Sequence, residues 1–110
     1  MSDYTPDRWV VIKITGDSTP IHKVFACWYG GYAGSDSWKL NSGITSSALE
    51  GNVYYFNGSS GSVYECHKNC YGTNMYGMSV LSNMIEKAKG NGITIEILPE
   101  DTNWLEINYE

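Results

Sequence analysis

One segment of the chain, residues 75–89, repeats its apolar side chains with the period of an α-helix. The residues of its expected buried face lie three or four positions apart: Met78, Leu81, Met84, Ile85 and Ala88. Thr73 or Asn74 is suited to cap the start of this helix, and Gly90 is suited to the left-handed position after its end. A single helix can shield only one face of a β-sheet, so this segment constrains how the rest of the chain packs.

The other apolar segments are short, alternate with polar residues and are separated by clusters of Gly, Ser, Asn and Asp, which is typical of β-strands. They predict five or six strands, in residues 8–15, 21–29, 37–40, 53–56, 62–68 and 93–98. The polar residues 41–52 are expected to form a loop, and the aromatic tail 101–110 is expected to pack on the domain. The fold class predicted is α+β, mainly one antiparallel sheet with the helix of the C-terminal half packed on one face.

The uncovered face of such a sheet would carry large aromatic side chains. Depending on the register of the strands, they come from Trp9, Trp28, Tyr29, Tyr54 and Tyr64. An exposed aromatic face of this size is typical of a binding site or of a subunit interface. We therefore expect a homodimer or a higher homo-oligomer, in which the same patch meets itself.

Length and charge restrict the classes of partner. At 110 residues the chain is expected to form one domain, residues 1–110. Seven Lys and Arg against twelve Asp and Glu give a net charge of −5, and Arg8 is the only arginine. This balance argues against long nucleic acid as a partner, because duplex-binding proteins need a clustered basic face. No apolar run is long enough to span a membrane and no signal peptide is apparent, so we expect a soluble, cytosolic protein.

The three cysteines, Cys27, Cys66 and Cys70, are an odd number, which fits a reducing compartment better than a disulfide framework. The spacing of Cys66, His67 and Cys70 does not match the paired knuckles of zinc sites. Cys66 and His67 would also point to opposite faces of a strand. We expect no metal and no cofactor.

The segment 28–43 combines large aromatic rings with glycines, which is the usual composition of a recognition surface. We take as candidate ligand-binding residues Trp28, Tyr29, Gly30, Gly31, Tyr32, Asp36, Trp38, Lys39 and Asn41 from this segment, with Arg8 and His67 from elsewhere. The expected ligand is a small, nucleotide-like anion: the tryptophans would stack on its base, and glycine N–H groups with Lys39 or Arg8 would bind its phosphate. The alternatives stay open, since the tryptophans can be ordinary sheet-packing residues, the glycines a tight turn and the lysines solvated.

Three classes of function follow from these residues. The first is a binding protein for a small ligand, and the second is a protein–protein interaction module. The third is a small hydrolase that works through His67 and an acidic partner such as Asp36. No carboxylate stands at a spacing that marks a catalytic triad, so a binding protein is expected rather than an enzyme and no catalytic residue is assigned.

Several motifs together resemble small hypothetical proteins of tailed bacteriophages and viral metagenomes, over residues 8–98. The motifs are Trp28-Tyr29-Gly30-Gly31-Tyr32, residues 35–43, Gly61-Ser62-Val63-Tyr64, Cys66-His67-Lys68-Asn69 and Tyr71-Gly72. The resemblance implies a phage-encoded protein that acts inside a bacterium, and it brings no established activity. Small phage proteins of this kind often counter host defence, some by sequestering a nucleotide signal, and the binding function is expected by that analogy.

Overall fold

The computed structural model describes residues 3–30 and 34–109, which form seven strands and one α-helix. Branched and aromatic residues build a four-stranded antiparallel sheet in the order β3-β2-β1-β7. Its strands are β1 (Arg8–Thr15), β2 (Ile21–Trp28), β3 (Ser37–Leu40) and β7 (Thr94–Ile97). The predicted α+β class and the antiparallel pairing are confirmed.

A second antiparallel sheet, in the order β4-β5-β6, contains the strand that the sequence analysis missed. Its strands are β4 (Ile44–Glu50), β5 (Val53–Gly58) and β6 (Val63–His67). The prediction of a loop over residues 41–52 is wrong because β4 is held by backbone pairing with β5 rather than by an apolar face. Gly51, with a φ of 61°, supplies the left-handed residue of the tight turn between them.

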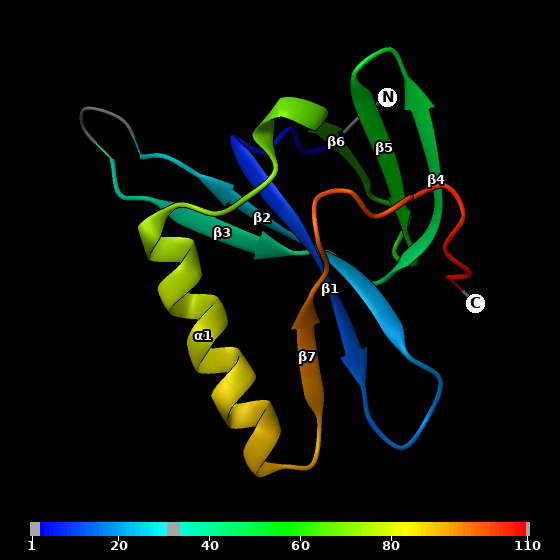
Figure 1. Cartoon of the computed structure of the whole chain (residues 1–110). Coiled ribbons are helices and arrows are strands. Elements are labelled where there is room, and N and C mark those ends of the chain that lie inside the picture. The colour runs from blue at the N-terminus through cyan, green and yellow to red at the C-terminus, as the bar shows by residue number, and fades with distance from the viewer. Residues whose placement is uncertain (1–2, 31–33, 110) are drawn as a thin grey trace.

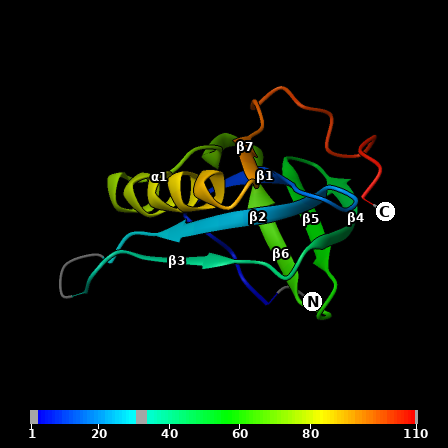
Figure 2. The same cartoon turned by 90° about the horizontal axis from the view of Figure 1, so that it is seen from below.

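The four-stranded sheet is the middle layer of the molecule. On one face, Val10, Ile12, Phe25 and Cys27 pack against Leu81 of α1 (Met75–Gly90). On the other face, Trp9, Val11, Val24 and Ala26 pack against residues of the second sheet, among them Phe56, Tyr64 and Cys66. Figure 1 shows α1 and the three-stranded sheet on opposite sides of the molecule, and Figure 2 shows the same arrangement from below.

The prediction of a single sheet with one uncovered face is therefore wrong, because the second sheet covers that face. Homo-oligomerisation stays a prediction, but the argument from a spare aromatic face no longer supports it. Four of the aromatic residues named for that face belong to or pack against the core between the two sheets: Trp9, Trp28, Tyr54 and Tyr64.

Helix α1 begins where the sequence predicts. The Asn74 side chain caps it by accepting a hydrogen bond from the Gly77 N–H at 2.6 Å. Gly77 lets the helix approach β2 closely, since a Cβ at this position would collide with Cys27 Sγ. The expectation for Gly90 is wrong: Gly90 is the last helical residue, and Gly92 adopts the positive φ, 75°, that turns the chain into β7.

No helix among the described residues has both the length and the apolarity needed to cross a bilayer.

After β7 the chain crosses back over both sheets without regular secondary structure, which confirms that the tail packs on the domain. Trp104 is 1% exposed and lies in the core between the sheets. Its carbonyl oxygen accepts hydrogen bonds from Ser47 Oγ of β4 at 2.8 Å and from the Tyr109 hydroxyl at 2.6 Å. We call residues 98–109 the C-terminal segment.

Candidate functional site

The predicted site residues on β3 point to opposite faces of the sheet. Trp38 pairs with Cys27 and stacks on Phe25 on the helix side, with ring centroids 5.4 Å apart and planes 14° apart. Lys39 lies on the other face, where its ammonium sits 5.0 Å from the centre of the Tyr4 ring. The two side chains proposed to hold one ligand therefore do not share a surface.

The preceding residues of the segment also have local partners. Trp28 donates from Nε1 to the Thr5 carbonyl at 3.0 Å. The Tyr29 N–H donates to the Asp7 carboxylate at 2.9 Å. The Gly30 N–H donates to the Asp36 carboxylate at 2.9 Å, which occupies the backbone donor that was expected to bind phosphate. Gly31 and Tyr32 lie outside the described residues.

The remaining predicted residues lie apart from β3 or are buried. Asn41 is 2% exposed, and its side-chain oxygen accepts a hydrogen bond from the Val24 N–H at 2.8 Å, so it supports the sheet. The Arg8 guanidinium donates to the Tyr71 carbonyl at 2.8 Å. His67 ends β6, with Nε2 3.3 Å from the Glu65 carboxylate rather than beside Asp36. The structure thus does not bring the described members of the predicted ligand-binding set together in one cavity.

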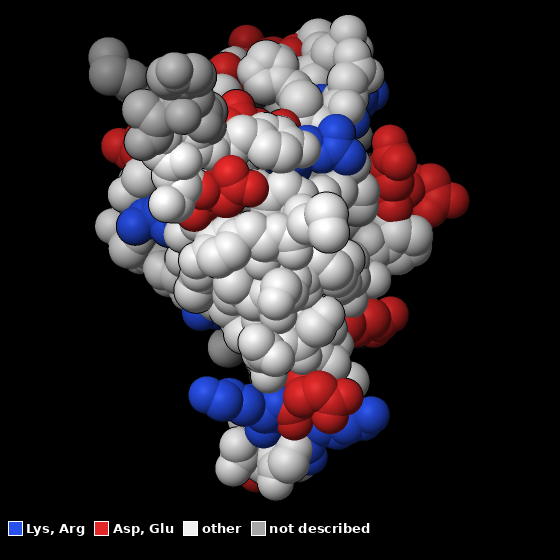
Figure 3. All heavy atoms as spheres, turned by 90° about the vertical axis from the view of Figure 1, so that its left-hand side faces the viewer, with Lys and Arg blue, Asp and Glu red and all other residues white. Residues whose placement is uncertain are grey.

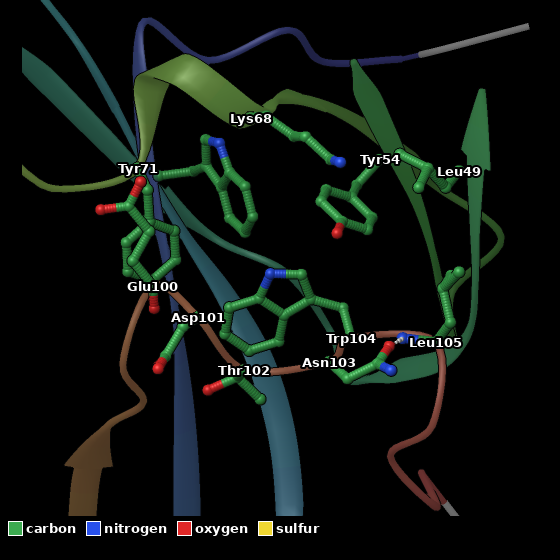
Figure 4. Close-up of a pocket in the computed structure, with 11 residues that line it drawn as sticks. Leu49, Tyr54, Lys68, Tyr71, Glu100, Asp101, Thr102, Asn103, Trp104 and Leu105 are labelled. Atoms are coloured by element: carbon green, nitrogen blue, oxygen red, sulfur yellow. Dashed lines mark hydrogen bonds between the residues drawn. The ribbon is translucent and has the colours of Figure 1, made fainter. Parts of the chain in front are cut away.

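A cavity of about 820 Å³ lies elsewhere, between the C-terminal segment, the strands β4 and β5, and the short 3₁₀ helix η1 (Lys68–Cys70). We call it the tail pocket. Its size is within the range of small-molecule sites. Figure 4 shows side chains of these separate segments pointing toward a common space. The pocket is lined by Trp9, Leu49, Tyr54, Lys68, Tyr71, Glu100, Asp101, Thr102, Asn103, Trp104 and Leu105.

Four aromatic rings form the apolar part of the tail pocket. Trp9 lies at its base and contacts the other three, with ring centroids 4.8 Å from Tyr71, 5.9 Å from Trp104 and 6.1 Å from Tyr54. The Trp9 indole is fixed by the hydrogen bond that its Nε1 donates to the His67 carbonyl at 2.7 Å. The rings hold one another in a preformed arrangement, which lowers the entropy cost of binding a ligand.

The phenol of Tyr71 is a structural group in this wall. Its hydroxyl donates to the Leu98 carbonyl at 2.5 Å and accepts from the Val11 N–H at 3.3 Å. Burial is the main cause that raises the pKa of Tyr71 to about 12, so the phenol stays neutral at physiological pH. Because both bonds go to backbone groups of the sheet and the C-terminal segment, Tyr71 fixes the wall of the pocket rather than reaching for a ligand.

The indole nitrogen of Trp104 is the polar atom best placed to meet a ligand. Trp104 Nε1 points toward the middle of the pocket, between Tyr71 and Tyr54, and no hydrogen bond joins it to the other lining residues (Figure 4). An indole N–H is a donor only and usually finds a partner when its ring is buried. A ligand atom that accepts a hydrogen bond would satisfy it.

Charged groups lie at the edge of the tail pocket and differ in sign. The Lys68 ammonium sits 5.7 Å from the centre of the Tyr54 ring. Glu100 and Asp101 lie in a turn that is closed where Thr102 donates from its backbone N–H to the Pro99 carbonyl at 3.1 Å. The site can therefore hold a flat ring against aromatic side chains, donate to an acceptor or anion, and accept from hydroxyl or amino groups.

The outer face of α1 is a second unusual surface. No charged residue occurs between Met75 and Ile85, while Met75 is 92% exposed, Tyr76 44% and Met78 43%. Figure 3, which looks at the side of the molecule where α1 lies, shows a broad uncharged area with charges gathered above and below it.

Sequence reasoning missed the tail pocket because its residues come from four separate segments. The available signal was the aromatic content of the tail, which predicted packing but not a cavity.

Among the residues that the structure describes, no three His, Cys, Asp or Glu side chains are placed to share a metal ion. Comparison with protein-family models, with curated proteins and with solved structures finds no significant match.

Proposed function

We propose that the protein binds a small molecule in the tail pocket and that the ligand carries a flat, hydrogen-bonding ring of the nucleoside type. The observation that carries the proposal is the combination of four aromatic rings with the unpaired Trp104 N–H in a cavity of about 820 Å³. We retain the nucleotide-like ligand expected from the sequence, but we propose that it binds in the tail pocket and not at residues 28–43.

The chemistry of the lining favours a nucleoside over a purely apolar ligand. A heteroaromatic base gains contact area against the rings and carries acceptors for the indole N–H. The carboxylates of Glu100 and Asp101 can only accept hydrogen bonds when ionised, so a ligand that contacts them must offer donors. Ribose hydroxyls and exocyclic amino groups are such donors.

The resemblance to proteins of tailed phages supplies a biological setting for this proposal. A phage protein that binds a nucleotide without converting it would lower the free concentration of a host defence signal. Sequestration of such a signal needs no catalytic group.

Calorimetry of the full chain against adenosine, guanosine, cytidine and uridine tests the proposal. Two neighbouring residues of β5 provide matched variants, because Tyr54 lines the tail pocket while Tyr55 does not. Tyr54→Ala is expected to weaken nucleoside binding at least about fivefold, since stacking on an aromatic ring contributes about 1–3 kcal/mol per base. Tyr55→Ala is expected to leave the affinity unchanged.

If no nucleoside binds with a Kd below about 100 μM, which corresponds to roughly −5.5 kcal/mol, the proposal fails. It also fails if both tyrosine variants weaken binding equally, because the ligand would then lie outside the tail pocket. Melting curves of both variants establish that each is folded at the temperature of the titration.

Binding of a protein partner is the second candidate, and the uncharged face of α1 is the observation that favours it. The partner would have to present an uncharged, apolar patch, because burying an unpaired charge against methionine side chains is costly. Met78→Glu would then abolish a stoichiometric complex, whereas Thr45→Glu, on the exposed part of β4, would not. A complex that withstands Met78→Glu would exclude this face.

A further inference from the structure

The tail pocket separates its two kinds of charge. Lys68 is held by η1 against the Tyr54 ring, and the structure gives it no ion pair with a described carboxylate. Glu100 and Asp101 come from the turn after Pro99, on the far side of the cavity from the Tyr54 ring (Figure 4). A ligand that matches this lining must be anionic at one end and rich in hydrogen-bond donors at the other.

The anionic end has two converging donors. The Lys68 side chain reaches the tail pocket beside Tyr54. The Trp104 indole nitrogen points into the same part of the pocket (Figure 4). An ammonium and an N–H directed at one oxyanion form charge-assisted hydrogen bonds, which are about twice as strong as neutral ones. The apolar rings beside them reduce the screening of the charge by water.

The donor end is suited to a ribose. Glu100 and Asp101 offer several acceptor positions, and the two hydroxyls of a ribose are donors. An acidic side chain on the ribose hydroxyls is a recurrent means of recognising nucleotides. The ring of the base would then lie between the two ends, against the aromatic side chains.

The number of charges limits the number of phosphates. Lys68 is the only cation in the lining, which has two carboxylates, so the formal charge of the pocket walls is −1. The whole chain carries a net charge of −5. Every phosphate beyond the first would add negative charge without a further cation to pair with it.

We propose that the ligand of the tail pocket is a nucleoside monophosphate, with its phosphate between Lys68 Nζ and Trp104 Nε1 and its ribose hydroxyls on Glu100 and Asp101. This inference rests on the proposed function, because it names the class of ligand for the same site. It also excludes Lys39 and Arg8 from phosphate binding.

Calorimetry with adenosine, adenosine monophosphate and adenosine triphosphate tests the inference on the full chain. The monophosphate is expected to bind about tenfold more tightly than the nucleoside, and the triphosphate more weakly than the monophosphate. A 2′-deoxyribose in the monophosphate is expected to weaken binding several-fold, because one donor to the carboxylates is lost.

The chain offers a matched control for the lysine. Lys68 and Lys39 are both exposed, and each lies over a tyrosine ring, but only Lys68 borders the tail pocket. Lys68→Gln is expected to remove the preference for the monophosphate over adenosine. Lys68→Arg is expected to restore the preference, and Lys39→Gln is expected to retain it.

Equal affinities for adenosine and its monophosphate would overturn the inference while leaving the proposed function standing. A preference that disappears equally in Lys39→Gln would also overturn it, since the effect would then be one of overall charge. Failure of every nucleoside and nucleotide to bind would instead refute the proposed function.

Discussion

Two places in this molecule bring a lysine over a tyrosine ring, and they differ in what surrounds the pair. Lys39 lies 5.0 Å from the Tyr4 ring centre on the edge strand β3, with Trp28 edge-on to Tyr4 at 6.4 Å. Lys68 lies 5.7 Å from the Tyr54 ring centre at the mouth of the tail pocket. The residue types are the same, but only the second pair borders the tail pocket.

Suitable residue types therefore form a binding site only where the fold places them around a concave surface. Around β3, alternation along the strand sends Trp38 and Lys39 to opposite faces. At the tail pocket, the C-terminal segment crosses the edge of the second sheet and places Trp104 opposite Tyr54. The second arrangement lets one ligand contact several side chains in a hollow, whereas the first does not.

Replacement of the two tryptophans should show the largest difference between these regions. Trp104→Ala is expected to cost about 3–5 kcal/mol of unfolding free energy because it empties a fully buried position. Trp38 is 37% exposed and stacks on one ring, so Trp38→Ala is expected to cost only about 1–2 kcal/mol. Urea unfolding curves measure both values. Equal losses would contradict the assignment of Trp104, and not Trp38, to the core.

High pH should weaken the wall of the tail pocket. The pKa of Tyr71 is raised from 10.0 to about 12, mainly by burial, so folding favours the neutral phenol. Its contribution is fully present below pH 10 and is lost as the pH rises toward 12, by roughly 2 kcal/mol. Unfolding midpoints in urea at pH 8 and pH 11 measure the loss.

Tyr71→Phe provides the control for this pH effect. The variant loses the two backbone hydrogen bonds and should be less stable at pH 8, but its stability should fall less steeply between pH 8 and pH 11. Tyr64, whose pKa burial also raises to about 12, remains in the variant and keeps part of the slope. An unchanged slope would contradict the burial of the Tyr71 phenol.

The smallest expected effect concerns Asn41, a residue that the sequence assigned to the ligand site. Asn41→Ala removes the acceptor of the buried Val24 N–H and is expected to cost roughly 1–2 kcal/mol. Nucleoside affinity of the folded variant should be unchanged, because Asn41 does not line the tail pocket. Weaker binding by a variant of normal stability would restore the original assignment.

The sequence predicted the elements that carry a clear periodic pattern. The cap at Asn74 and the apolar stripe of α1 are local features, and both were readable from neighbouring residues. Strand β4 was missed because only Ile44 of its seven residues is buried. Its local signal was the Gly51-Asn52 pair, which favours a tight hairpin turn.

The tail pocket could not be predicted because its contacts join distant parts of the chain. The Trp9 indole bonds to the carbonyl of His67, and Ser47 bonds to the carbonyl of Trp104. These contacts depend on how the second sheet packs on the first, which no local pattern encodes. Residues 28–43 were predicted as the binding site because their aromatic and glycine content can be read directly from the local sequence.

The four tryptophan indole N–H groups report directly on where a ligand binds. Two-dimensional ¹H–¹⁵N spectra of the full chain, assigned with single Trp→Phe variants and titrated with adenosine, give one signal for each indole. The Trp104 signal is expected to move furthest, because its N–H faces the tail pocket, while the signals of Trp28 and Trp38 are expected to stay in place. Movement of the Trp28 or Trp38 signal with a static Trp104 signal would contradict this expectation.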